Sequence, residues 1–115
     1  MALTGMEYDD TTIKLTKSDL SPNTSKVTIN NATIIKKGNV AYFTIDMTAV
    51  SAISSTDVLI SAGFPKALSI GQSFECTHNG IYYPFLININ GALHNYYKSI
   101  SNGTNFVLRG VYLCE

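Results

Sequence analysis

Three Asn-Gly pairs divide the C-terminal half of the chain at nearly equal intervals. They stand at Asn79-Gly80, Asn90-Gly91 and Asn102-Gly103, 11 and 12 residues apart, with aromatic and β-branched residues between them. Asn and Gly tolerate the positive φ of tight turns, and Asn-Gly between apolar runs is a strong hairpin signal. The spacing therefore predicts a β-meander of four strands, which we place at Gln72–His78, Ile81–Ile89, Ala92–Lys98 and Asn105–Leu113.

The first half of the chain also carries strand patterns. Residues 40–48 alternate, which assigns Ala41, Phe43, Ile45 and Met47 to the core and Val40, Tyr42, Thr44, Asp46 and Thr48 to the opposite face. Further strands are predicted at Val27–Ile29, Ala32–Lys36 and Asp57–Ser61, with an edge strand at Thr12–Thr16. No window of a dozen residues shows a helical apolar stripe. We expect an all-β fold, an antiparallel β-sandwich or jelly-roll-like barrel over residues 26–115, preceded by a linker or edge segment over residues 1–25.

The first predicted hairpin leaves apolar side chains on its outer face. A two-residue turn at Asn79-Gly80 pairs Cys76 with Tyr83 and Phe74 with Phe85, which places these four on the inner face. Tyr82, Pro84 and Leu86 then point outward, where a wet sheet face is normally polar. Either a second sheet or another subunit is expected to cover them.

The second predicted hairpin has two possible registers. A two-residue turn at Asn90-Gly91 pairs Ile87 with His94 and turns His94 and Tyr96 inward. A three-residue loop over residues 89–91, with Gly91 in the left-handed conformation, pairs Ile87 with Leu93 and turns His94, Tyr96 and Lys98 outward. A one-residue slip reverses the face of every side chain. The second register is preferred because it buries Leu93 rather than a histidine.

The low charge of the chain limits its partners. Charged residues make up 14% of the sequence, and eight basic residues balance eight acidic ones. No basic face is available to neutralise phosphates, so nucleic acid is not an expected partner. A polar, weakly charged surface suits neutral ligands such as sugars, or packing against sister subunits. It also fits an all-β domain whose loops are rich in Ser, Thr and Asn.

Neither a membrane span nor a leader is predicted. The longest dense apolar stretch, Ile81–Ile89, is too short to cross a bilayer and contains Pro84. The N-terminus lacks the basic and then apolar segments of a signal peptide. We expect a protein that stays inside the cell, or that leaves by lysis or as part of a larger particle.

No known catalytic or metal-binding pattern occurs. There is no nucleophile elbow, phosphate loop or zinc spacing. His78 and His94 lack a nearby cysteine or carboxylate cluster, and Asp46, Asp57 and Glu75 fall on different strands or strand ends. We therefore expect a non-enzymatic protein with no catalytic residues, no metal and no cofactor.

The two cysteines, Cys76 and Cys114, are too few for a disulfide framework. Two free thiols are expected, with a single Cys76–Cys114 bridge as the alternative.

One cluster of residues has the composition of a ligand-binding surface. His94, Tyr96 and Lys98 lie close together in sequence, and Tyr82 lies on the preceding predicted strand. Tyrosine rings stack on the apolar faces of sugars, and His and Lys bond to hydroxyls. Tyrosines are also ordinary strand residues, and alternation places half of them in the core. The sequence predicts a glycan site at His94, Tyr96, Lys98 and Tyr82.

From Lys36 onward, the order of short motifs resembles the C-terminal head domains of phage tail fibres and receptor-binding proteins, chiefly of phages infecting Gram-positive bacteria. Four segments carry the resemblance: Lys37–Ala41 with its Gly-Asn-Val, Leu59–Pro65 running into a proline, the hairpin Ile87–Leu93, and Gly110–Tyr112 in a closing strand. Phe64 departs from the leucine that usually precedes the proline. No binding residue transfers position by position.

The resemblance implies a receptor-binding head of a phage or prophage tail. Such a head is a small β-sandwich that forms a homotrimer, is attached to a tail fibre or baseplate, and binds host cell-surface saccharide. Phage tails leave by host lysis, which agrees with the missing signal peptide, and the outward Tyr82, Pro84 and Leu86 suit a trimer interface. The alternatives are a structural fibre or baseplate module with no ligand, and a monomeric carbohydrate-binding module of a secreted protein.

Overall fold

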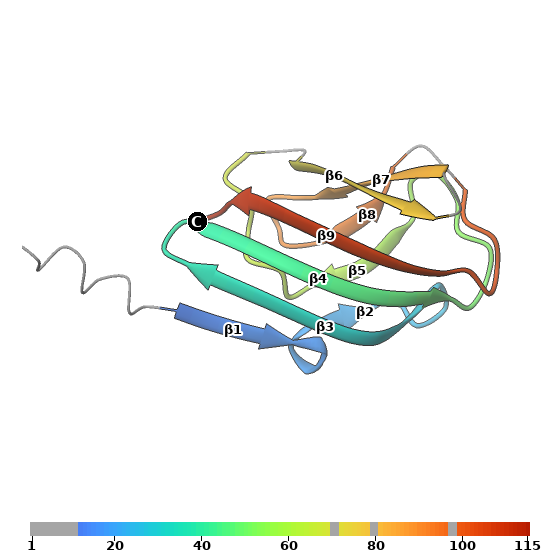
Figure 1. The fold of residues 1–115 in the computed structure, drawn as a ribbon, viewed down its shortest axis with the longest axis horizontal. Helices are drawn as coiled ribbons and strands as arrows, with labels where there is room; N and C mark the ends of the chain where they lie inside the picture. The colour runs from blue at the N-terminus through green and yellow to red at the C-terminus, as the bar shows by residue number, and fades with distance from the viewer. Residues whose placement is uncertain (1–11, 70–71, 79–80, 97–98) are drawn as a thin grey trace, which may run out of the picture.

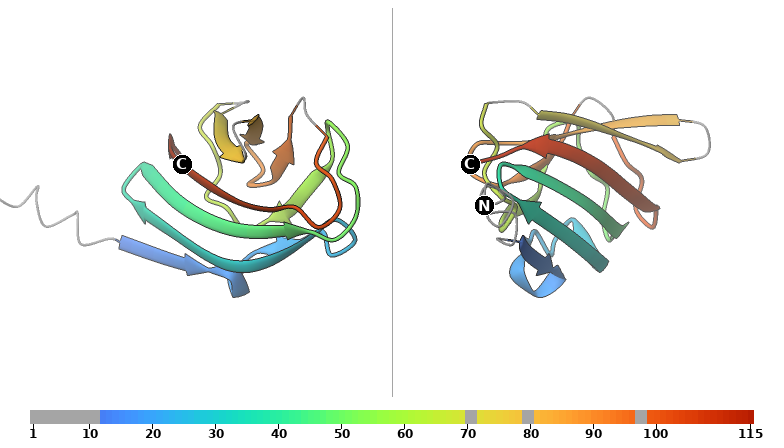
Figure 2. Two further views of the ribbon diagram at one scale, coloured as in Figure 1. Left: turned by 45° about the vertical axis from the view of Figure 1, so that its right-hand side comes forward. Right: turned by 60° about the vertical axis from the view of Figure 1, so that its left-hand side comes forward.

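Two antiparallel β-sheets lie face to face and enclose a hydrophobic core (Figure 1). This computed structural model describes residues 12–69, 72–78, 81–96 and 99–115, and for residues 72–78 and 81–83 it describes the main chain alone. Figure 2 shows the two layers from the side. The predicted all-β class is confirmed, and the sheets are arranged as a sandwich.

Each sheet combines strands from both halves of the chain. The four-stranded sheet has the order β1 (Thr12–Thr16), β3 (Val27–Lys37), β4 (Val40–Ala49) and β9 (Asn105–Leu113). The five-stranded sheet has the order β2 (Ser21–Pro22), β5 (Val58–Ala62), β8 (Leu93–Asn95), β7 (Ile81–Ile87) and β6 (Gln72–His78). A three-residue 3-10 helix, η2 (Lys17–Asp19), joins β1 to β2, and no α-helix is present among the described residues.

Alternation along β4 places the core as predicted. Ala41, Phe43, Ile45 and Met47 are all buried, whereas Val40, Tyr42 and Thr44 are exposed. Because β9 pairs with β4 along its length, Phe106, Leu108 and Tyr112 add a second buried row.

Aromatic side chains join the two sheets across this core. Phe85 of β7 stacks on Phe106 of β9 with ring centroids 5.6 Å apart, and Phe43 meets Phe64 edge-to-face at 5.4 Å. The Tyr112 hydroxyl donates a hydrogen bond of 2.7 Å to the Pro65 carbonyl, and burial raises the pKa of Tyr112 far above its ordinary value. The interior is therefore held by specific ring contacts as well as by apolar area.

The predicted four-strand meander is wrong in its last step. Strands β6, β7 and β8 do form a meander, but β9 crosses to the other sheet and pairs with β4. The Asn102-Gly103 turn docks on the end of β4, where the Gly103 N–H donates to the Ala49 carbonyl at 2.7 Å. An Ile53–Ile100 bridge precedes this crossing. The turn residues were correctly read, but they lead the chain between sheets instead of closing a hairpin.

Both predicted hairpin registers are confirmed. In the first, Cys76 faces Tyr83 and Phe74 faces Phe85, although residues 79–80 themselves lie outside the described part. In the second, Ile87 faces Leu93, and the Asn88 N–H donates to the Ala92 carbonyl at 3.0 Å around a three-residue loop. Strand β7 therefore ends at Ile87, two residues before the predicted end.

The segment before Lys26 contributes an edge strand to each sheet. The strand predicted over Thr12–Thr16 is confirmed as β1, beside β3, and β2 pairs with β5. Leu20, between them, is buried in the core.

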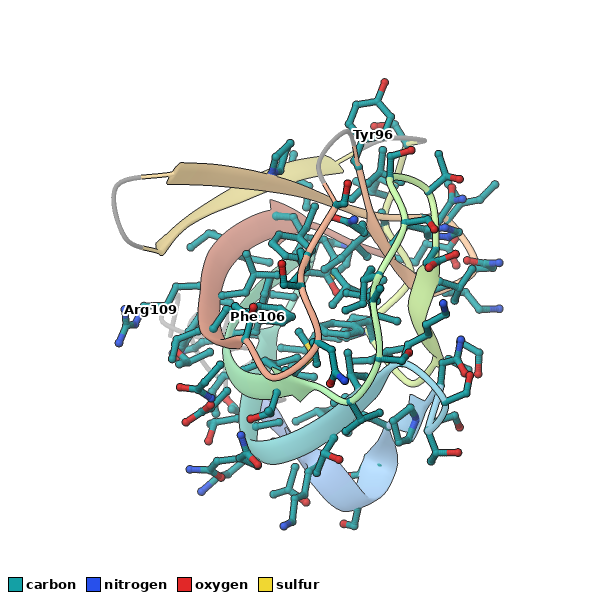
Figure 3. All side chains as sticks on the ribbon, turned by 90° about the vertical axis from the view of Figure 1, so that its right-hand side faces the viewer. Tyr96, Phe106 and Arg109 are labelled. Carbon is teal, nitrogen blue, oxygen red and sulfur yellow. The ribbon has the colours of Figure 1, made fainter. Side chains whose placement is uncertain are left out.

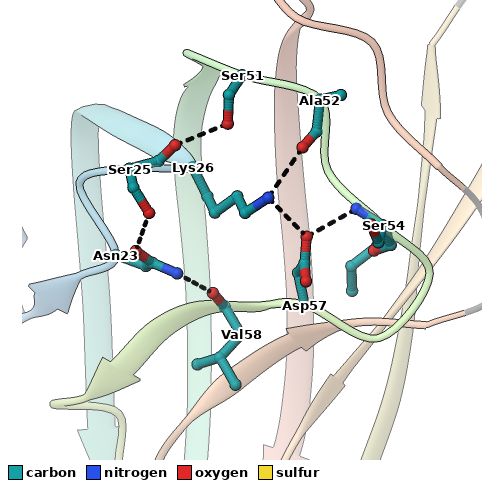
Figure 4. A network of polar contacts seen from close by, with 9 residues as sticks. Asn23, Ser25, Lys26, Ser51, Ala52, Ser54, Asp57 and Val58 are labelled. Atoms are coloured by element: carbon teal, nitrogen blue, oxygen red, sulfur yellow. Dashed lines mark hydrogen bonds and ion pairs between the residues drawn. The ribbon is translucent and has the colours of Figure 1, made fainter.

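A polar network closes one end of the sandwich (Figure 4). The Lys26 ammonium, just before β3, lies 3.2 Å from Asp57 Oδ2 and donates to the Ala52 carbonyl at 3.1 Å. The Asn23 side chain donates to the Val58 carbonyl at 3.0 Å. These contacts fasten the start of β3 to the start of β5, which belong to different sheets.

Cys114 is a free, buried thiol, as predicted, and is therefore not bridged. The side chain of Cys76 lies outside the described part.

Candidate functional site

The predicted glycan cluster is only partly described. Tyr96 is 40% exposed at the end of β8, and His94 is half-buried. Lys98 and the side chain of Tyr82 lie outside the described residues. The preferred register is confirmed, because Leu93 is buried and Tyr96 is exposed.

His94 is poorly placed to bind a ligand. Its Nε2 is enclosed and has no hydrogen-bond partner among the described residues. The following residue, Asn95, is fully buried and donates to the Ser54 carbonyl at 2.7 Å. Tyr96, which directly follows β8, is therefore the one clearly exposed side chain from Leu93 to Tyr96.

A second candidate surface lies on the outer face of the four-stranded sheet. The register places the outward side chains of β3, β4 and β9 in rows: Ile35, Tyr42 and Val111; Thr33, Thr44 and Arg109; Asn31, Asp46 and Val107. Two adjoining hollows follow these rows. Figure 3 shows that Arg109 extends away from this sheet, while Tyr96 extends from a different side of the molecule.

The larger hollow belongs to an exposed apolar area. Its volume is about 440 Å³, and Ile35, Tyr42 and Val111 line it. Val40 and Leu113 are paired beside Tyr42 and Val111 on the same face. The exposed fractions of these four β4 and β9 side chains run from 38% for Val40 to 66% for Val111. We name Ile35, Val40, Tyr42, Val111 and Leu113 the apolar strip.

Polar residues make up most of the lining of the smaller hollow, and we name it the polar hollow. It has a volume of about 230 Å³ and is lined by Asn31, Thr33, Thr44, Asp46, Val107 and Arg109. It shares Thr33, Thr44 and Arg109 with the larger hollow, so the two are continuous.

A β-bulge in β3 supplies the Asn31 side chain that lines the polar hollow and the Asn30 amide that bonds to Asp46. Ile29 faces Met47 and Asn31 faces Asp46, so Asn30 is an extra residue in the ladder. Both Asn30 and Asn31 are exposed, because the bulge interrupts the alternation between the two faces. The two strands predicted at Val27–Ile29 and Ala32–Lys36 are therefore one strand, β3, with the bulge between them.

Two asparagines hold the Asp46 carboxylate from one side. Asp46 Oδ1 accepts from Asn30 Nδ2 at 3.2 Å and from Asn105 Nδ2 at 2.7 Å. The same amides donate to Thr48 Oγ1, at 2.8 and 3.2 Å. Asp46 Oδ2 accepts no hydrogen bond from any residue that the structure describes. The carboxylate is thus fixed by one oxygen and has the other available.

Arg109 brings a positive charge to the same hollow without neutralising Asp46. Within the described ranges, neither side chain takes part in an ion pair. The Asn31 side chain uses its Oδ1 to accept from the Ala32 N–H at 3.0 Å. The hollow therefore presents a carboxylate acceptor, guanidinium donors and two threonine hydroxyls around one small space.

Part of this surface could be predicted from the sequence. Alternation over residues 40–48 correctly placed Tyr42, Thr44 and Asp46 outward. It could not place Arg109 beside them, because the meander prediction kept β9 out of this sheet. The bulge at Asn30 was not predicted from the sequence.

In the described part of the chain, no three His, Cys, Asp or Glu side chains come together in a group that could hold a metal ion. None of the described helices is long and apolar enough to cross a bilayer. No protein-family model matches the chain, and no curated protein matches it.

Proposed function

We propose that this chain is a non-enzymatic receptor-binding head domain of a phage or prophage tail, which binds host cell-surface saccharide as a homotrimer. The observation that supports it most is the outer face of the four-stranded sheet, where an exposed apolar strip adjoins a polar hollow. Such a face offers one area for association and another for a hydroxyl-rich ligand. In this proposal the remainder of a tail fibre or baseplate carries the domain, and the particle is released by lysis.

The apolar strip is the better candidate for the subunit interface. The interface predicted at Tyr82, Pro84 and Leu86 has two half-buried members, Pro84 and Leu86, and the side chain of Tyr82 is not described. The strip instead places four well-exposed apolar side chains together on β4 and β9. Contiguous exposed apolar patches mark association sites, and charged residues are depleted at the centres of interfaces.

A substitution in the strip tests the assembly. Val111→Arg places a charge on the most exposed member of the strip, so it should change the stability of the single chain little. In an assembled trimer the same charge would be buried without a partner, which would strongly weaken association. We expect the unmodified protein to have three times the chain mass by light scattering and Val111→Arg to have the mass of one chain. Thr28→Arg, exposed on the same sheet beyond the polar hollow, is the matched control and should remain trimeric.

The mass of the unmodified protein and its binding to glycan or host cell wall together separate the rival functions. A monomeric unmodified protein would reject the trimeric head and favour a carbohydrate-binding module. A trimer that binds no glycan or host cell wall would favour a structural fibre or baseplate module.

A further inference from the structure

We infer that the polar hollow binds one neutral pyranose ring through a pair of adjacent hydroxyls. The inference rests on the proposed function and names its ligand class. Asp46 accepts from the hydroxyls, Arg109 donates to them, and Asn31, Thr33 and Thr44 complete the rim.

The hydrogen-bonding groups of the hollow are complementary to a diol. A carboxylate only accepts and a guanidinium only donates, whereas a hydroxyl does both. Asp46 Oδ1 is already occupied by Asn30 and Asn105, which leaves Oδ2 to accept. One hydroxyl of a vicinal pair can donate to Oδ2 while its neighbour accepts from Arg109. A site built in this way discriminates strongly against analogues that lack the hydroxyl.

The charges of the hollow favour a neutral ligand. Asp46 and Arg109 carry opposite charges, line the same hollow and are not ion-paired with each other. An anionic sugar would gain from Arg109 but be repelled by Asp46, and a cationic sugar would meet the reverse. An uncharged ring uses both groups without either repulsion.

Size limits the ligand to one ring. The hollow measures about 230 Å³, below the roughly 300–1,000 Å³ of sites for drug-sized molecules. Val107 lines the hollow and provides apolar surface for the C–H face of a sugar.

The preformed geometry of Asp46 supports a binding role. Two amide groups orient its carboxylate, and the bulge at Asn30 is what brings the first of them into reach. Positioned polar groups supported by surrounding hydrogen bonds lose little freedom when a ligand arrives.

The test is amide chemical-shift mapping of the assembled protein with single sugars as probes. The neutral probes are the methyl pyranosides of glucose, galactose and mannose; glucuronic acid and glucosamine are the charged probes. We expect at least one neutral glycoside to shift the amides of Asn31, Thr44, Asp46 and Arg109, with a dissociation constant of about 1 mM for so small a ligand. Neither charged probe should bind more tightly than its neutral counterpart.

Two conservative variants link the shifts to the proposed contacts. Asp46→Asn keeps the shape of the side chain, and Arg109→Gln keeps a donor without the charge. Each should weaken binding about tenfold or more, because a charge-assisted hydrogen bond is lost. Ile89→Ala, at an exposed position in the β7–β8 loop and outside the hollow, is the matched control and should bind as the unmodified protein does. A dispersed spectrum confirms that each variant is folded.

The outcomes separate this inference from the proposed function. Neutral sugars that shift amides around Tyr96 and leave the polar hollow unchanged would overturn the inference and keep the glycan-binding function. Tighter binding of glucuronic acid would overturn the neutral ligand class. If no probe shifts any amide, the inference is wrong; adsorption of the trimer to Gram-positive cell walls would then keep the receptor function, and its absence would reject both.

Discussion

Asp57 shows how a single side chain can fasten the ends of two sheets. Its Oδ2 accepts from the Ser54 N–H at 2.7 Å and lies 3.2 Å from the Lys26 ammonium (Figure 4). The hydrogen bond from Ser54 is the main cause that lowers the pKa of this carboxyl below its ordinary value, and Lys26 lowers it further against the opposing effect of burial. The carboxylate is therefore more stable in the folded protein than in the unfolded chain.

The lowered pKa of Asp57 predicts the sign of a pH effect. Its contribution to stability is fully present above the unfolded pKa of about 3.9, and it is lost as the pH falls through the lower folded pKa. Asp57→Ala should reduce the free energy of unfolding by about 1 kcal/mol at pH 7. Urea titrations should show the difference from the unmodified protein shrinking between pH 4 and pH 2, on the scale of carboxyl titration.

A matched variant separates the hydrogen bond from the ion pair. Lys26→Met removes the ion pair and the hydrogen bond to the Ala52 carbonyl but keeps the hydrogen bond from Ser54 to Asp57. It should cost less, about 0.5 kcal/mol, because partly exposed ion pairs contribute little. A difference between Asp57→Ala and the unmodified protein that is equal at pH 7 and at pH 2 would contradict the titration account.

At the scale of elements, the three Asn-Gly pairs separate what sequence can predict from what it cannot. The local signal for a turn is the same at Asn90-Gly91 and at Asn102-Gly103. The first closes a hairpin within one sheet, and the second carries the chain to the other sheet, where it bonds to Ala49. Turn chemistry is local, so it was predictable. The partner of the following strand depends on distant packing, because Phe106 and Leu108 fill the inner row beside β4.

A comparison of Gly91 with Gly38 tests how much the stability of a turn depends on the residues packed around it. Both have positive φ, +80° and +60°. A Cβ at Gly91 would lie 2.5 Å from the Phe64 carbonyl oxygen, whereas a Cβ at Gly38 would meet nothing within 4 Å. Gly38→Ala should cost about 1 kcal/mol from conformational strain alone. Gly91→Ala should cost roughly 3 kcal/mol, because a backbone clash is added. Thermal unfolding followed by circular dichroism measures both, and equal losses would refute the role of the contact with Phe64.

At the scale of the whole molecule, the fold class could be predicted from the sequence, but the assignment of strands to the two sheets could not. Alternation and turn spacing were sufficient for an all-β sandwich, and they placed Ala41, Phe43, Ile45 and Met47 in the core. They could not show that β9 lies beside β4, so the polar hollow formed by β3, β4 and β9 was missed. A site built from strands far apart in sequence becomes visible only when the pairing of those strands is known.

Strand β9 contributes both to the core, through Phe106, and to the candidate site, through Arg109. The Phe106 ring stacks on Phe85 across the sandwich at an interplanar angle of 15°, and Arg109 of the same strand lines the polar hollow. Figure 3 shows Phe106 inside the molecule and Arg109 extending outward. Disturbing the inner face of β9 should therefore affect the outer face as well.

Graded truncation of Phe106 tests this coupling. Phe106→Ala should destabilise the fold by about 3–5 kcal/mol, because a buried ring leaves a cavity, and Phe106→Leu by about 1.5 kcal/mol. Val50→Ala, an exposed control, should change stability by less than about 0.5 kcal/mol. Denaturant unfolding followed by circular dichroism and by the Arg109 amide signal should give one shared transition for each variant, since both report on a single cooperative core. An Arg109 signal that is lost well before the strand signal would show that β9 separates from the sandwich on its own.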